Sequence, residues 1–263
     1  MREEARVPME QPHRAGVCAL AVMAKAPRSG EVKTRLVPPL KAEEAAILST
    51  CFLKDVTANF LAAAESAPLA GYIAYSPPGS GAVFRALVPP EIELLPSRRA
   101  GLGHSLLDAT EDLLASGYGA ACLVNSDSPT LPTSILIEAA EALQAPGDRV
   151  ILGPASDGGY YLIGLKRPHR QLFEEIAWST DRVFRQTVER AASIGLDVVT
   201  LPAWYDVDDA TSLGWLCREV VTGRRPPDCG RPGFSAPATS SYLRALALAG
   251  DAERLGVDRA MVD

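Results

Sequence analysis

The sequence predicts an α/β protein with a mostly parallel sheet between two layers of helices. Short apolar runs of strand length alternate along the chain with longer segments whose apolar residues recur at helical spacing. The 263 residues are 47% hydrophobic and 22% charged, which is the composition of an ordinary globular protein with a sizeable core. The alternation therefore predicts a three-layer domain.

The first half of the chain supplies three of the predicted strands. Residues 17–24 (VCALAVMA) are continuously apolar, as expected for a strand buried on both faces. A polar turn over 25–35 precedes a helix over 41–64, whose apolar face repeats every four residues. Strands follow at 71–76 and 93–95. A helix around Leu106 to Leu114 ends near Gly117, which suits the position after a helix end.

The second half continues the alternation. A buried strand at 120–124 runs into the polar residues 125–129, and Pro132 opens a helix that reaches about Gln144. Strands at 149–152 and 160–165 flank a turn, and Ser179 or Thr180 caps the next helix. The last strand covers 197–201. It leads through 206–209 into a helix that ends near Val221.

Composition divides the chain into three parts. Residues 1–16 read as a flexible extension, and 17–222 as the α/β domain. The remaining part, 223–263, begins as a linker rich in Gly, Pro and Arg and continues as an Ala/Leu helix over 240–255. We expect this helix to pack back on the domain or on a partner, a homodimer being one such arrangement.

Charge and residue usage exclude several classes of function. The net charge of −6 leaves no basic footprint for nucleic acid. No apolar stretch approaches the roughly 20 residues that span a bilayer, and the first residues lack a signal-peptide core. The five cysteines are scattered along the chain and read as free thiols. The three histidines lie far apart in the sequence, which argues against a zinc site. We therefore expect a cytoplasmic protein with no membrane partner.

The first candidate site is the turn over 25–35 (KAPRSGEVKTR), which holds four cations in an acidic protein. Backbone N–H groups of a glycine-containing turn can bind phosphate oxygens while Lys and Arg neutralise their charge. The turn lacks the residue order of a P-loop and of a dinucleotide fingerprint. An ordinary solvated basic loop is the alternative.

The second and third candidates are aspartates that follow strands. Asp127 lies just past the strand at 120–124, where a carboxylate suits Mg²⁺ or Mn²⁺; the alternative is that it only organises a turn before Pro129. In the segment 206–209 (DVDD), alternation places Asp206 and Asp208 on one side. Acids also suit a helix N-terminus, so Asp208 or Asp209 is alternatively a cap. Both readings hold if one aspartate caps and another reaches a metal.

A fourth candidate is the turn over 156–161 (SDGGYY). Two glycines allow close approach of a ligand to the backbone, although a plain hairpin also explains them. The acid and the tyrosines beside them suit hydroxyl-rich or ring-shaped ligands, and Trp178 adds a ring unless it belongs to the core. Ligands of open α/β sheets bind outside the carboxyl ends of strands, so we expect all four clusters at one rim.

Five segments, taken in order, resemble a bacterial family of GT-A-type transferases described as selenodomain-associated or arsenosugar-biosynthesis glycosyltransferases. They are 23–36 (MAKAPRSGEVKTRL), 123–132 (LVNSDSPTLP), 152–165 (LGPASDGGYYLIGL), 178–187 (WSTDRVFRQT) and 206–209 (DVDD), and the likeness runs from about 17 to 221. The opening is also similar to phospholactate guanylyltransferases of the wider nucleotidyltransferase clan. The family usually has glycine where this chain has Asn125, which also tolerates left-handed backbone.

The resemblance implies a Rossmann-like GT-A (nucleotide-diphospho-sugar transferase) fold with a mostly parallel mixed sheet and a divalent metal, Mg²⁺ or Mn²⁺. It implies metal ligands Asp127 and Asp208, with Asp206 as a neighbour. The nucleotide-binding residues on this reading are Ala24, Lys25, Gly30, Lys33, Arg35 and Ser126. The substrate-binding residues are Asp157, Gly158, Gly159, Tyr160, Trp178 and Ser179, and the catalytic residues are Lys33, Arg35 and Asp157.

Three functions follow as expectations. The leading one is metal-dependent glycosyl transfer from a nucleotide-sugar to a small-molecule acceptor. The alternative is nucleotidyl transfer, in which an NTP and a phosphorylated small molecule give a nucleotide-activated product and pyrophosphate. The third is a non-catalytic nucleotide- or sugar-binding protein, because a fold alone does not establish activity.

Overall fold

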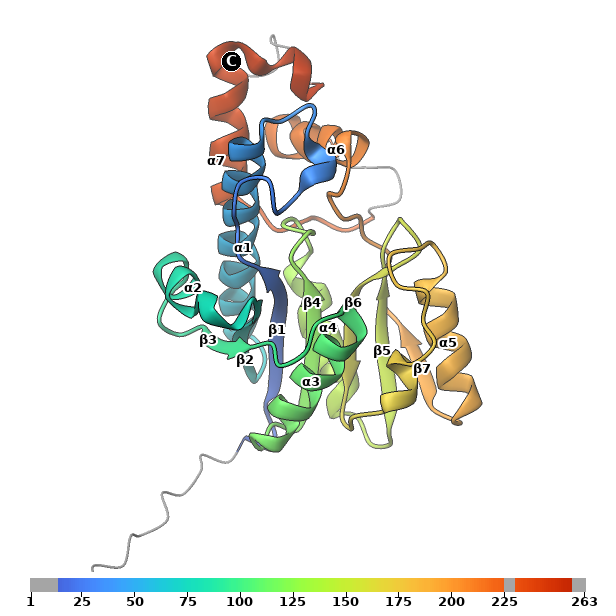
Figure 1. The fold of residues 1–263 in the computed structure, drawn as a ribbon. Coiled ribbons are helices and arrows are strands. Elements are labelled where there is room, and N and C mark those ends of the chain that lie inside the picture. Colours follow the sequence, from blue (N-terminus) through green and yellow to red (C-terminus); the bar gives the residue numbers. More distant parts are fainter. Residues whose placement is uncertain (1–13, 225–229, 257–263) are drawn as a thin grey trace, which may run out of the picture.

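A seven-stranded mixed sheet forms the centre of the computed structural model, which describes residues 14–224 and 230–256 (Figure 1). Along the sheet the strands follow the order β3-β2-β1-β4-β6-β5-β7. Strand β6 is antiparallel to both neighbours, and the other pairs are parallel. The strands are β1 (Cys18–Lys25), β2 (Leu69–Ser76), β3 (Glu93–Pro96), β4 (Ala120–Asn125), β5 (Arg149–Pro154), β6 (Tyr160–Leu165) and β7 (Asp197–Thr200). The predicted mostly parallel sheet is confirmed.

Helices cover both faces of the sheet and explain the continuous apolar runs. In β1, Leu20 and Val22 belong to one hydrophobic core, whereas Ala19 and Ala21 belong to the other. One face carries α1 (Ala42–Ala64), α2 (Gly81–Leu87) and α4 (Thr133–Gln144). The same core extends to α7 (Pro237–Leu246), which packs on α1, and to α6 (Ala210–Thr222), which packs on α7. The other face carries α3 (Leu102–Ala115), α5 (Val183–Ser193) and the short turn η3 (Arg170–Phe173). The remaining short helical turns are η1 (Thr34–Leu36), η2 (Pro78–Ser80), η4 (Ala247–Asp251) and η5 (Glu253–Leu255).

Helix α1 is the central helix of the first core. Its residues Leu48, Phe52, Val56 and Phe60 are almost wholly buried, as the four-residue repeat predicts. Among the described residues, α1 is the one helix whose length and composition would allow it to cross a membrane. Here its apolar side packs against the sheet and α7, so it serves as a core helix.

The C-terminal segment packs back on the domain, as one of the two expected arrangements. Asp55 of α1 accepts hydrogen bonds from the N–H groups of Ala238 (2.9 Å) and Thr239 (2.8 Å) at the start of α7. Farther on, Arg254 donates to both carboxylate oxygens of Glu44 (2.7 and 2.8 Å) and to the carbonyl of Pro39 (2.7 Å). These contacts tie the segment to the start and the middle of α1 and to Pro39, between the basic turn and that helix (Figure 1).

Several local expectations need correction. The structure adds α2, in a stretch of the sequence for which no element was predicted. Helix α5 begins at Val183, so neither Ser179 nor Thr180 is its N-cap residue. Ser179 has left-handed backbone (φ 63°), and the Thr180 hydroxyl donates to the carbonyl of Ala177 (2.7 Å). The predicted single helix over 240–255 ends at Leu246 and continues as the short turns η4 and η5.

Three of the predicted segments fall partly outside the described residues. Of the predicted flexible extension, residues 1–13 lie outside them, whereas 14–16 form a turn in which the N–H of Val17 donates to the carbonyl of Arg14 (2.8 Å). Residues 225–229 of the predicted linker and 257–263 of the predicted tail also lie outside them.

Candidate active site at the strand ends

The ends of the central strands bring the four clusters to one rim. Parallel strands β1 and β4 end there at Lys25 and Asn125, and antiparallel β6 begins there at Tyr160. The segment after β7 crosses the end of β4, where the N–H of Val207 donates to the carbonyl of Asp127 (2.8 Å). The order of the strands therefore joins residues far apart in the sequence.

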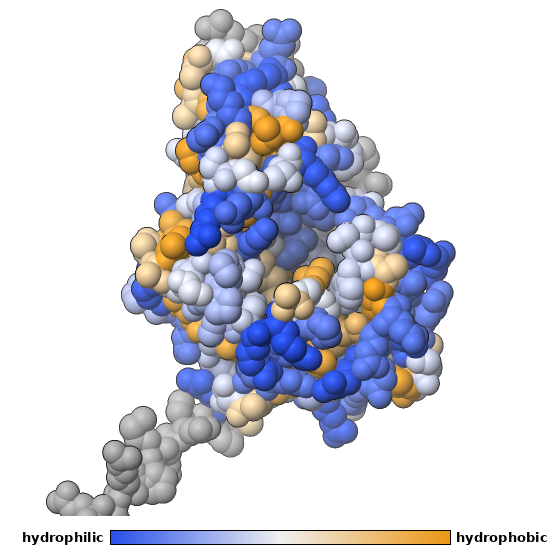
Figure 2. All heavy atoms as spheres, in the orientation of Figure 1, coloured by the Kyte–Doolittle hydropathy of each residue, from blue (hydrophilic) through white to orange (hydrophobic). Residues whose placement is uncertain are grey.

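A cavity of about 640 Å³ opens at this rim, and Figure 2 shows the face hollowed at its centre between hydrophilic residues. Most of the predicted site residues line it: Lys25, Lys33, Arg35, Ser126, Asp127, Asp157, Gly159, Tyr160, Trp178, Ser179, Asp206 and Asp208. Three predicted residues are not among the lining residues. Ala24 is buried in the core, Gly30 lies exposed in the basic turn, and Gly158 packs against Asp181.

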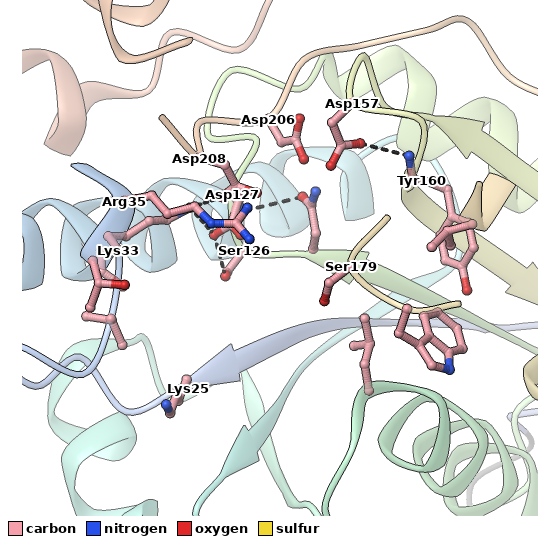
Figure 3. A pocket seen from close by; sticks show the side chains of 18 of the residues that line it. Lys25, Lys33, Arg35, Ser126, Asp127, Asp157, Tyr160, Ser179, Asp206 and Asp208 are labelled. Atoms are coloured by element: carbon pink, nitrogen blue, oxygen red, sulfur yellow. Dashed lines mark hydrogen bonds and ion pairs between the residues drawn. The ribbon is translucent and has the colours of Figure 1, made fainter. Parts of the chain in front are cut away.

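Lys33 joins the two acidic segments of the rim. Its ammonium contacts Asp127 Oδ1 (2.7 Å), Asp208 Oδ1 (2.9 Å) and the carbonyl of Val207 (2.7 Å), and its side chain is only 8% exposed (Figure 3). Burial alone would lower the pKa of Lys33, but the two carboxylates outweigh it and raise that pKa. Its three N–H donors are all engaged within the protein. Lys33 thus organises the acids, which differs from the expected direct contact with phosphate.

Asn125 shapes the turn that presents Asp127. Its side-chain oxygen accepts a hydrogen bond from the backbone N–H of Asp127 (3.3 Å), and the Ser126 hydroxyl donates to Asp127 Oδ1 (2.8 Å). The turn-forming role considered for Asp127 is thus filled by Asn125, which leaves the Asp127 carboxylate facing Lys33. The turn forms with asparagine in place of glycine, as expected.

Asp208 and Asp209 divide the two roles considered for them. The Asp209 carboxylate accepts from the N–H of Ser212 (2.8 Å) and caps α6. The side chain of Asp208 instead lines the cavity, where its oxygen contacts Lys33. The acidic run therefore provides both a helix cap and a cavity carboxylate.

Three carboxylates form a group that could hold a metal ion. Oxygens of Asp157, Asp206 and Asp208 lie within 4.8 Å of one another. Burial raises the pKa of Asp206 to about 7, and the negative charges of Asp157, Asp208 and Asp127 contribute to that rise. An all-oxygen donor set fits Mg²⁺ or Mn²⁺. The structure thus adds to this group Asp157, which was expected as a substrate-binding and catalytic residue, and places Asp127 next to it through the shared contact with Lys33.

The side of the cavity away from the basic turn is formed by residues that the sequence reading only partly found. Trp178, considered as a core residue, is half-buried and lines the cavity beside Tyr160, with ring centroids 6.4 Å apart. Thr180, considered with Trp178 and Ser179 as a ligand contact, also lines it, whereas Leu102 and Asp181 line it and were not expected there. For Leu102, the available signal was the pair of glycines on either side of it, at 101 and 103.

The strand order and the rim define a nucleotide-diphospho-sugar transferase fold. Residues 59–180 match the family model described as "Uncharacterized protein conserved in bacteria (DUF2064)". That span holds the turns at Asp127 and Asp157 but not the basic turn or 206–209. No curated protein matches the sequence.

Solved structures share the architecture over most of their length. A protein from Desulfovibrio desulfuricans G20, provisionally described as a nucleotide-diphospho-sugar transferase, has a TM-score of 0.73 and 27% identity, over 88% of this chain and 95% of that one. A cytidylyltransferase from Leptospira borgpetersenii serovar Hardjo-bovis has a TM-score of 0.50 and 8% identity, over 92% and 97%. The bifunctional IspDF from Campylobacter jejuni has a TM-score of 0.50 and 11% identity, over 75% and 53%. The last two share the fold alone.

Proposed function

We propose that this protein is a metal-dependent transferase of a nucleotide-activated substrate, and that it transfers a glycosyl group from a nucleotide-sugar to a small acceptor. The likeness to the Desulfovibrio protein, described as a transferase of this kind, supports the proposal over 88% of the chain. The observation that carries it is the group Asp157, Asp206 and Asp208 beside cations in one cavity.

The charge balance of the cavity supports a metal requirement. Its lining carries three cations (Lys25, Lys33 and Arg35) against six acids (Glu31, Asp127, Asp157, Asp181, Asp206 and Asp208). An anionic diphosphate does not bind a net acidic cavity without further positive charge. Asp206 and Asp208 would hold Mg²⁺ or Mn²⁺ together with the substrate phosphates, and the bound ion would neutralise charge on the departing nucleotide diphosphate.

The cations left free favour a diphosphate donor. Lys33 is held by carboxylates, and Arg28 faces Glu31 at 4.0 Å. Lys25 and Arg35 therefore remain as the cavity cations that can face phosphate oxygens, although Lys25 also donates to the carbonyl of Glu31 (3.3 Å). Two such cations suit a nucleoside diphosphate better than the triphosphate of a nucleotidyl transfer.

In the proposed reaction the acceptor hydroxyl oxygen bonds to the anomeric carbon of the sugar. The bond from that carbon to the diphosphate oxygen breaks, and the nucleoside diphosphate leaves with the electron pair. The hydroxyl proton passes to a base, and the exposed Asp157 carboxylate in the cavity is our candidate. Arg35 would stabilise the charge of the leaving group.

A thermal-shift panel of UDP-, GDP-, CDP- and ADP-sugars against free NTPs, each with Mg²⁺ or Mn²⁺, tests the proposal. A ligand at 100 times its Kd stabilises the fold by about 2.7 kcal/mol, which raises Tm by roughly 5–10 °C for a chain of this size. We expect this shift with a nucleotide-sugar, followed by glycoside and free nucleoside diphosphate in the mass spectrum. A shift with NTPs alone, with pyrophosphate as product, would instead establish nucleotidyl transfer.

Asp208→Asn and Asp197→Asn form a matched pair for the metal requirement. Asp208 lines the cavity, whereas Asp197 is exposed at the start of β7, the strand end opposite the rim. The first variant should lose the metal-dependent shift and turnover, and the second should keep both. Unchanged metal dependence in Asp208→Asn would refute the role of the acidic group.

A further inference from the structure

The two sides of the cavity differ in chemistry. In Figure 3, Lys25, Lys33 and Arg35 lie on one side, Tyr160 lies on the other, and Asp206 and Asp157 lie between them. The ring of Trp178 lies beside that of Tyr160, with 6.4 Å between centroids, and its edge packs against Gly103, next to Leu102. With Ser179, Thr180 and Asp181, which follow Trp178 and also line the cavity, these residues form what we call the aromatic end. If the nucleotide occupies the basic side, as proposed above, the aromatic end is left for the second substrate.

The aromatic end is held in a fixed shape by close backbone packing. A Cβ atom at Gly103 would come within 2.7 Å of Trp178 Nε1, so only glycine there admits the edge of the indole. The N–H of Ala177 donates to the side chain of Gln186 (2.8 Å), and Ser179 adopts left-handed backbone (φ 63°). Backbone of this kind persists only where the surroundings enforce it. The aromatic end therefore has this shape before any substrate binds.

The charge of the aromatic end is negative. Within the described part of the chain, no lysine or arginine belongs to this end, whereas Asp181 does, and Asp157 lies at its border between the two sides. The arginines nearest to Leu102 in the sequence are engaged elsewhere, since Arg98 pairs with Asp112 (3.1 Å) and Arg99 donates to Asp108 (3.0 Å). A phosphate or carboxylate placed here would meet two like charges and no partner, which is costly.

We propose that the second substrate is an uncharged, hydroxyl-bearing ring compound, and that Trp178 is a specificity-determining residue for it. The indole and the neighbouring Leu102 and Tyr160 offer apolar surface to a ring. Ser179, Thr180 and the two carboxylates offer partners for its hydroxyl groups. This inference rests on the proposed function, which makes a nucleotide-sugar the first substrate. Its electrostatic premise, the negative charge of the aromatic end, concerns the protein without any ligand.

Fluorescence quenching tests the premise without any ligand. The difference between the wild type and Trp178→Phe isolates the emission of Trp178 from that of Trp204 and Trp215. Neutral acrylamide should quench this emission, and iodide should be at least roughly fivefold less effective, because the local potential repels anions. Equal quenching by iodide would overturn the inference. This outcome is independent of whether a nucleotide binds.

Matched acceptor panels test the specificity. Neutral sugars and aryl glycosides, and the phosphates of the same compounds, are added with the best nucleotide-sugar, and release of nucleoside diphosphate is compared with that in water alone. Acceleration by neutral members supports the proposal, and acceleration by phosphates alone overturns it. If neither panel accelerates release, the quenching experiment decides whether the proposal stands: weak quenching by iodide supports it, and equal quenching overturns it. Failure of every nucleotide to bind would refute the proposed function and leave the quenching result standing.

Three variants examine Trp178 directly. Trp178→Ala should raise the KM for the neutral acceptor about tenfold and leave the KM for the donor unchanged. Gly103→Ala should have a similar effect, because the added methyl displaces an unaltered indole. Trp215→Phe is the control, since Trp215 packs against Tyr205 and is not a lining residue. Equal effects on both KM values would indicate a structural role and contradict the assignment.

Discussion

Replacing Gly158 with alanine should disturb the site without touching a cavity side chain. Gly158 has φ 89°, and a Cβ atom there would lie 2.3 to 2.7 Å from the backbone of Asp181. The carbonyl of Gly158 also accepts from the N–H of Phe184 (2.9 Å) near the start of α5. Because the obstacle is backbone, the methyl group can be accommodated only if the segment after Trp178 moves away.

The expected cost combines two contributions. Left-handed backbone costs an L-residue about 1–2 kcal/mol. Overpacking against a closed site adds about 1–3 kcal/mol. Together they predict a loss of about 2–5 kcal/mol in the free energy of unfolding. Gly195 provides the control because its φ is 66° and nothing lies within 4 Å of its added Cβ, so alanine there carries the backbone cost alone.

Urea unfolding of the wild type, Gly158→Ala and Gly195→Ala measures both contributions. The difference between the two variants should be at least about 1 kcal/mol, and Gly158→Ala should also weaken binding at the aromatic end. Equal losses of unfolding free energy in the two variants would show that the backbone at Asp181 moves to accommodate the methyl group at no measurable cost. The inference that the aromatic end has a fixed shape would then be refuted.

Three further outcomes follow from ion pairs and caps. Lys33→Met should lower the free energy of unfolding by about 1–3 kcal/mol in urea titrations, because two half-buried carboxylates lose their shared cation. The hydrogen bond from Arg254 lowers the pKa of Glu44 below its ordinary 4.5. The ionised Glu44 therefore stabilises the folded protein fully above pH 4.5, and this stabilisation is lost as the pH falls from there through the lowered pKa. The difference in unfolding free energy between the wild type and Glu44→Gln should therefore shrink from pH 6 to pH 3. Asp55→Ala should cost about 1–3 kcal/mol and expose the start of α7 to hydrogen exchange, because a buried and a partly buried N–H group lose their acceptor.

The pattern of apolar residues predicted the sheet, and the position of the polar residues after the strands predicted the rim. The buried strands were readable because β1 and β4 are apolar without interruption, and their following polar residues had to meet at one edge. Helix α2 was missed because its seven residues follow a Pro-Pro-Gly turn and are too few to show a clear period. Strand and helix length thus limited what the pattern could predict.

Side-chain partners were harder to predict than strand ends. The sequence placed Lys33 at a phosphate, yet its donors are taken by Asp127 and Asp208, one of which lies 175 residues away. Trp178 and Ser179 were predicted to bind substrate, but the alternatives of a core residue and a helix cap stayed open, because the packing of this segment against Gly103 and Gly158 depends on contacts between distant segments. Such contacts leave no local spacing in the sequence.

The link from Arg254 to Glu44 has a consequence for the order of assembly. The two residues are 210 positions apart, so the ribosome must make nearly all of the described chain before the link can form. The strands and helices in between can fold earlier, because domains begin to form during synthesis. The segment at Pro39 would then be fixed in place last, after the sheet and the cavity at its rim have formed.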